Sequence, residues 1–109
     1  MAASPPSSSS PRERIRAVVP KLIDITEKVL FGDVWERPGL PKRDRSLITC
    51  AALIALQRPD QLRIHLERAL ENGVTKDELS ELITHLAFYS GWPTAVTAAG
   101  IAKEIFDKR

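Results

Sequence analysis

Apolar residues recur with helical spacing along almost the whole chain after residue 11, and no segment shows the alternating pattern of a β-strand. Residues 12–19 predict a short helix. Residues 20–30 predict a second one, with Pro20 in its first turn, where the missing N–H costs no hydrogen bond. Gly32 ends this helix, and residues 33–41 predict a loop.

Longer helical patterns follow the loop. Residues 42–57 are apolar all round in their second half, which predicts a central helix buried on all sides. Residues 58–72 predict the next helix. Thr75 and Glu78 have the spacing of a capping box that opens another, and residues 93–107 predict the last. The expected fold is all-α, a compact bundle of about five helices.

Composition narrows the class of protein. Residues 1–11 have few hydrophobic side chains and no charged one, so we expect a disordered tail, with residues 12–109 as the folded domain. The net charge of +2 is too weak to indicate nucleic acid, and no apolar run is long enough to cross a membrane. The single cysteine, Cys50, cannot form an internal disulfide. We expect it to be a small buried hydrophobe in a protein of a reducing compartment, the cytoplasm.

Two histidines are the main candidates for chemistry. His65 lies on the apolar face of its predicted helix, where a histidine is either a hydrogen-bonded core residue or a catalytic group with a shifted pKa. His85 shares a more polar face with Glu78 and Glu81, a pattern that also fits a solvated pair of side chains. Two histidines and one cysteine are too few for a closed zinc site, so we expect no metal.

Two arginines begin the predicted helix at residues 42–57. Arg43 and Arg45 lie where the helix dipole disfavours cations, which indicates either an anionic partner or a salt bridge to a nearby carboxylate. The sequence has no phosphate-binding loop, dinucleotide fingerprint or nucleophile elbow.

The chain resembles the carboxymuconolactone decarboxylase family over about residues 20–106. The resemblance is carried by separate segments in the family's order: VLFGDVWERPGL (29–40), RDRSL (43–47), HLERALENGVT (65–75) and THLAFYSGWP (84–93). The related alkylhydroperoxidase D-like branch uses a CxxC pair, but Arg58 and Gln61 stand at those positions here. The resemblance therefore implies the decarboxylase-like branch, with an alkylhydroperoxidase D-like helical fold, no cofactor, and typically a homohexamer.

The implied activity is decarboxylation of 4-carboxymuconolactone, or of a related small lactone or carboxylic acid, to the enol-lactone of 3-oxoadipate. Loss of carbon dioxide leaves a dienolate, so the reaction needs an apolar wall, a cation for the developing oxyanion, and a general acid. We assign the acid to His65, with His85 and Glu36 as alternates, the anion contact to Arg45, with Arg43 in reserve, and the wall to Trp35, Tyr89 and Trp92.

Other classes of function remain open at this point. A helical oligomer that binds a small acid without turning it over, or an accessory subunit, fits the same pattern, and a redox role through Cys50 is the weakest alternative. The apolar faces are wide for a domain of this size, and Phe31, Trp35 and Phe88 lie near predicted helix ends. This excess predicts a closed homo-oligomer, a trimer or a hexamer.

Overall fold

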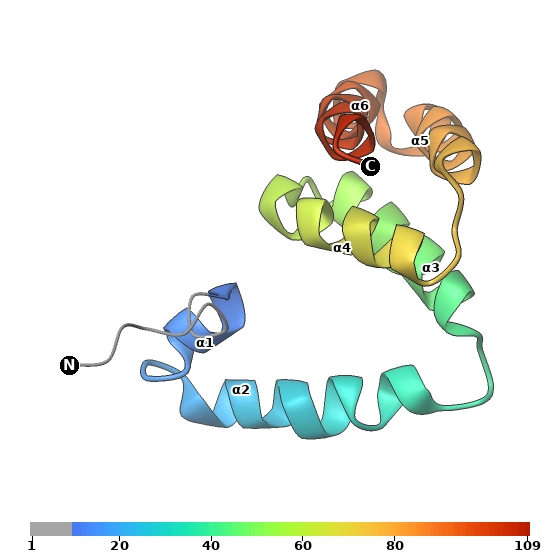
Figure 1. The fold of residues 1–109 in the computed structure, drawn as a ribbon. Helices are drawn as coiled ribbons and strands as arrows, with labels where there is room; N and C mark the ends of the chain where they lie inside the picture. The colour runs from blue at the N-terminus through green and yellow to red at the C-terminus, as the bar shows by residue number, and fades with distance from the viewer. Residues whose placement is uncertain (1–9) are drawn as a thin grey trace. The chain divides into compact units, whose positions relative to one another are not determined.

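A computed structural model describes residues 10–109, and the chain divides into two compact units, Met1–Gly39 and Leu40–Arg109 (Figure 1). Every regular element of the described residues is helical, which confirms the all-α prediction. Residues 1–9, which make up most of the predicted tail, lie outside the described residues. No described helix is long and apolar enough to cross a membrane.

The N-terminal unit contains short helices. They are α1 (Pro11–Ile15), α2 (Pro20–Ile25), the π-helix η2 (Thr26–Phe31) and the 3-10 helix η3 (Val34–Glu36). The helix predicted at residues 20–30 is therefore α-helical only in its first half. A Cβ atom at Gly32, just after η2, would lie 2.7 Å from the carbonyl oxygen of Lys28 and 2.8 Å from that of Glu27. Only glycine fits this close approach of the backbone.

Aromatic packing and charge pairs hold this unit together. Trp35 is buried, and its ring centroid lies 6.0 Å from that of Phe31. The guanidinium of Arg12 lies over the Phe31 ring, 5.1 Å from its centroid. Arg16 forms ion pairs with Glu13 and Glu27 and so ties α1 to η2.

The C-terminal unit is a bundle of four helices, α3 (Lys42–Ala55), α4 (Pro59–Glu71), α5 (Lys76–Ser90) and α6 (Trp92–Asp107). Helix α3 packs against α4 and α5, and α6 packs against the same two helices (Figure 1). Every helix contributes to one apolar core, whose members include Cys50, Leu66, Leu79 and Ala98, all at most 1% exposed. This burial supplies the main stabilisation of the unit.

Local signals set most helix ends in this unit. Pro59 begins α4, and Gly73, with φ +99°, follows its end. Thr75 Oγ1 accepts a hydrogen bond from the Glu78 N–H at 3.0 Å, and Glu78 Oε1 accepts one from the Thr75 N–H at 2.9 Å. The predicted capping box is therefore confirmed. Gly91, with φ +102°, separates α5 from α6.

The prediction that α3 is buried on all sides is wrong. Ser46, Cys50 and Ile54 are buried at four-residue intervals, which marks one buried face. Ile48 is 58% exposed and Leu56 is 64% exposed. Helices α4 and α5 cover only part of the circumference of α3, so its apolar surface is larger than the area its neighbours can bury.

Candidate functional site

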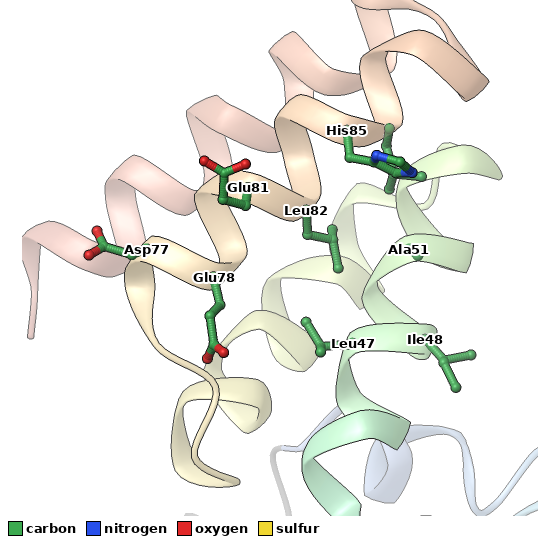
Figure 2. Close-up of a pocket in the computed structure, with 9 residues that line it drawn as sticks. Leu47, Ile48, Ala51, Asp77, Glu78, Glu81, Leu82 and His85 are labelled. Carbon is green, nitrogen blue, oxygen red and sulfur yellow. The ribbon is translucent and has the colours of Figure 1, made fainter.

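An open groove of about 640 Å³ lies between α3 and α5 (Figure 2). We call it the α3–α5 groove. Its lining residues are Leu47, Ile48 and Ala51 of α3 and Asp77, Glu78, Glu81, Leu82, His85 and Leu86 of α5. Figure 2 shows Leu47 and Leu82 in the space between the two helices, whereas Asp77 and Glu81 project from α5 away from α3. The groove therefore has an apolar floor and a polar rim.

The rim of the α3–α5 groove is acidic. It carries three carboxylates, and no lysine or arginine is among its lining residues. Arg43 lies beside the groove in an ion pair with Glu78, and its guanidinium is also 3.3 Å from an Asp44 carboxylate oxygen. A hydrogen bond from the Thr75 backbone N–H, supported by Arg43, lowers the pKa of Glu78. Arg43 thus matches the salt-bridge alternative left open above, and the groove presents negative charge.

His85 lines the α3–α5 groove and also packs against an exposed aromatic patch. Its ring centroid lies 4.9 Å from that of Tyr89, with the rings tilted by 30°. Phe88 and Trp92 pack edge to face with centroids 5.3 Å apart. We use the name aromatic patch for four residues and their exposed fractions: Phe88 (72%), Tyr89 (78%), Trp92 (60%) and Val96 (63%).

His65 occupies a different part of the unit. The side chain is half-buried on α4, its Nδ1 atom is buried, and it lines neither this groove nor the pocket described below. Burial lowers the pKa of His65, and the nearby charge of Arg68 lowers it further. Asn72, the C-cap residue of α4, donates its side-chain amide to Ser46 Oγ at 3.0 Å. This hydrogen bond ties the end of α4 to α3.

The remaining predicted residues are distributed over both units. Arg45 lies in the first turn of α3, and its Nε donates to the carbonyl oxygen of Leu40 at 3.1 Å. Trp35 and Glu36 lie in η3 of the N-terminal unit, the tryptophan buried and the glutamate exposed. Of the eight predicted site residues, the structure places His85 against Tyr89, and it does not place His65 in the groove that His85 lines.

A smaller pocket, of about 180 Å³, lies where α3, α4 and α6 meet. We call it the Arg58 pocket, and its lining residues are Leu53, Ile54, Gln57, Arg58, Pro59, Leu62, Thr94, Thr97 and Ala98. Gln57 has φ +58°, the left-handed region in which non-glycine residues are uncommon. Sequence reasoning missed this pocket. The available signal was a polar pair, Gln57 and Arg58, directly after an apolar helix.

Cys50 is fully buried, and this burial raises the pKa of its thiol to about 12. The thiol therefore stays protonated at neutral pH, in agreement with the predicted role as a small hydrophobe. Within residues 10–109, no group of three or more histidine, cysteine, aspartate or glutamate side chains is arranged to hold a metal ion.

The sequence of this chain is similar to those of known proteins. The chain is 54% identical over 76 residues to the 4-carboxymuconolactone decarboxylase of Acinetobacter baylyi, an alignment that covers 70% of this chain and 57% of that protein. It is 40% identical over 68 residues to the nitrosuccinic acid decarboxylase of Metarhizium robertsii, covering 62% and 48%. An uncharacterized 15.0 kDa protein of Paracoccus denitrificans is 35% identical over 79 residues, covering 70% and 58%.

The chain spans about half the length of these relatives, between 48% and 58%. Residues 20–104 match the carboxymuconolactone decarboxylase family, close to the extent of the resemblance found in the sequence. This match includes all four helices of the C-terminal bundle except the last residues of α6, together with α2, η2 and η3. The chain therefore belongs to the carboxymuconolactone decarboxylase family.

Proposed function

We propose that this protein is a carboxy-lyase that decarboxylates 4-carboxymuconolactone or a related small lactone or carboxylic acid. The observation that carries the proposal is its 54% identity to a 4-carboxymuconolactone decarboxylase. A second relative, named for the decarboxylation of nitrosuccinic acid, supports a small acid as the class of substrate.

The proposed reaction breaks the bond between the lactone ring and its carboxylate. The electron pair of that bond stays on the substrate as a dienolate, carbon dioxide leaves, and an acid delivers a proton to carbon. Because the lactone carbonyl of the substrate accepts the electron pair, the chemistry requires no cofactor. The protein must stabilise the oxyanion and supply the proton.

In this proposal His65 is the general acid. Burial and the charge of Arg68 lower its pKa, so its imidazolium form is a stronger acid than a free imidazolium but is the minor form at neutral pH. Arg45 is the proposed anion contact, and Arg43, already paired with Glu78, stays in reserve. His85 and Glu36 are the alternate acids, and the apolar wall consists of Trp35, Tyr89 and Trp92.

We also propose that a second copy of the chain covers the aromatic patch, as part of a trimer or hexamer in the cytoplasm. Four large apolar side chains more than half exposed form an unusual surface for a small monomeric protein. Light scattering measures the assembly. Trp92→Ser is expected to lower the assembly state, and wild-type protein that is monomeric at micromolar concentration would contradict this part of the proposal.

The activity is tested by following the ultraviolet absorbance of 4-carboxymuconolactone with the purified full chain. We expect turnover that a metal chelator does not change. We also expect His65→Asn to reduce kcat by roughly a hundredfold or more, the range of general acid catalysis, and His85→Asn to reduce it much less. The matched control is Arg63→Gln, an exposed position of the same helix as His65. Binding without turnover in an assembled oligomer would instead indicate a non-catalytic acid-binding protein.

A further inference from the structure

The Arg58 pocket carries the opposite charge to the α3–α5 groove. Among the described residues that line it, Arg58 alone is charged, and the others are apolar or are polar and neutral. Asp60, the carboxylate nearest to Arg58 in sequence, lies in the first turn of α4 and does not line the pocket. A guanidinium facing a pocket without carboxylates favours an anionic occupant.

Arg58 also lacks a charge partner within residues 10–109. Other arginines of the bundle are paired: Arg43 with Glu78, and Arg63 with Glu104. Arg109 lies 3.8 Å from a carboxylate oxygen of Glu67. Among residues 10–109, the Arg58 guanidinium has no ion pair and no hydrogen bond, so its donors are available to a ligand.

Neutral polar side chains line the same pocket as Arg58. Thr94 Oγ1 donates to the carbonyl oxygen of Gly91 at 2.7 Å and lies 2.7 Å from Ser90 Oγ, so this hydroxyl is held in place. Thr97 lies almost one turn further along α6, and its exposed hydroxyl has no hydrogen bond within residues 10–109. The Gln57 amide is the second neutral donor that the lining offers to a ligand, because Thr94 already gives its hydroxyl proton to the Gly91 carbonyl.

The size of the pocket limits the ligand. A volume of about 180 Å³ corresponds to about six water molecules, since each occupies about 30 Å³ in the liquid. This space fits a short carboxylic acid, whose few apolar atoms would contact Leu53 and Leu62. We propose that the Arg58 pocket binds a small carboxylate, with the Arg58 guanidinium as its counter-charge and Thr97 as a second donor. This assignment goes beyond the proposed decarboxylase activity and does not depend on turnover.

The test uses the full chain, with propionate as the anionic probe and propionamide as its uncharged counterpart of similar shape. Amide proton–nitrogen NMR is recorded as each compound is added. We expect saturable shifts at Gln57, Arg58, Thr94 and Thr97 with propionate, and much smaller ones with propionamide. Arg58→Gln is expected to weaken propionate binding about tenfold, the usual scale for a lost charge-assisted contact.

Two further variants keep the test informative. Arg63→Gln removes a guanidinium from the same helix outside the pocket, so it should bind propionate like the wild type. Arg58→Lys keeps the charge and should retain part of the affinity, even if Arg58→Gln alters the fold. The proposal is overturned if propionate shifts no amide of the pocket, if propionamide binds equally well, or if Arg58→Gln folds and binds unchanged. A chain that binds propionate but shows no turnover would contradict only the proposed function.

Discussion

The α3–α5 groove and the Arg58 pocket both use α3, but they differ in charge and in size. The groove is more than three times larger and is rimmed by the carboxylates of Asp77, Glu78 and Glu81. The pocket is small and carries one arginine and no acid. For an anionic ligand the smaller space is the better site, because the acidic rim repels the ligand whereas a guanidinium attracts it. Volume alone therefore does not identify where a carboxylate binds.

The two histidines show the same contrast. His85 lies in the acidic groove, exposed and packed against Tyr89. His65 lies half-buried on α4, next to the positive charge of Arg68. Arg58 is the N-cap residue of α4 and lines the Arg58 pocket, whereas His65 lies further along this helix and does not line that pocket. The histidine that we propose as the acid thus has a cationic neighbour, whereas the alternate acid His85 lies among carboxylates.

The largest expected effect on stability comes from a substitution in the core beneath α4, the helix that carries His65 and follows Arg58. Leu66 is fully buried, so Leu66→Ala should lower the free energy of unfolding by about 2–5 kcal/mol. Thermal denaturation measures the loss. Leu66→Met, which nearly conserves the volume, should cost less than about 1.5 kcal/mol. Equal melting temperatures for Leu66→Ala and the wild type would show that α4 does not depend on this contact.

A smaller effect is expected on the groove side, where the capping box begins α5. Thr75→Ala removes the side-chain oxygen that accepts from the Glu78 N–H and should cost about 1 kcal/mol. Chemical denaturation measures the change. Thr84→Ala is the matched control, because this exposed hydroxyl bonds only to the Ser80 carbonyl within the same helix. If Thr75→Ala lowers the free energy of unfolding no more than Thr84→Ala does, the capping hydrogen bond does not stabilise α5.

The pH dependence of stability separates the two histidines. The folded-state pKa of His65 lies below the ordinary value of 6.5, so folding favours its neutral form. Its contribution to stability is therefore present above about pH 6.5 and is lost as the pH falls through the lowered pKa. We expect the melting temperature to fall between about pH 7.5 and about pH 5.5, and His65→Asn to reduce that fall. A fall that persists in His65→Asn and disappears in His85→Asn would reverse the assignment.

The smallest expected effect is on propionate affinity, and it tests whether the carboxylates of the α3–α5 groove influence the Arg58 pocket. Neither Asp77 nor Glu81 lines the Arg58 pocket, and salt at physiological strength screens exposed charges over about 8 Å. Asp77→Asn and Glu81→Gln should therefore change propionate affinity by less than about twofold. Asp60→Asn, close to Arg58 in sequence, should raise it more than either. A larger gain in propionate affinity from Asp77→Asn or Glu81→Gln would show that the carboxylates of the groove also act on the Arg58 pocket.

The sequence predicted the features that depend on neighbouring residues. The capping box at Thr75 and the glycines that end helices act within a few residues of the chain, so their patterns are sufficient evidence. The exposure of Ile48 and Leu56 was not predictable, because it depends on which faces of α3 its neighbours cover. The Arg58 pocket is lined by residues of three helices that lie up to 45 positions apart, from Leu53 to Ala98, and no local pattern connects them.

The central claim is that the chain breaks a carbon–carbon bond and protonates the product. It is tested most directly by turning over 4-carboxymuconolactone in heavy water and measuring carbon dioxide and product mass together. We expect one carbon dioxide and one deuterium on carbon for each substrate consumed, with both signals lost together in His65→Asn. Consumption of the lactone without carbon dioxide, or no consumption by the assembled protein, would contradict the decarboxylase assignment.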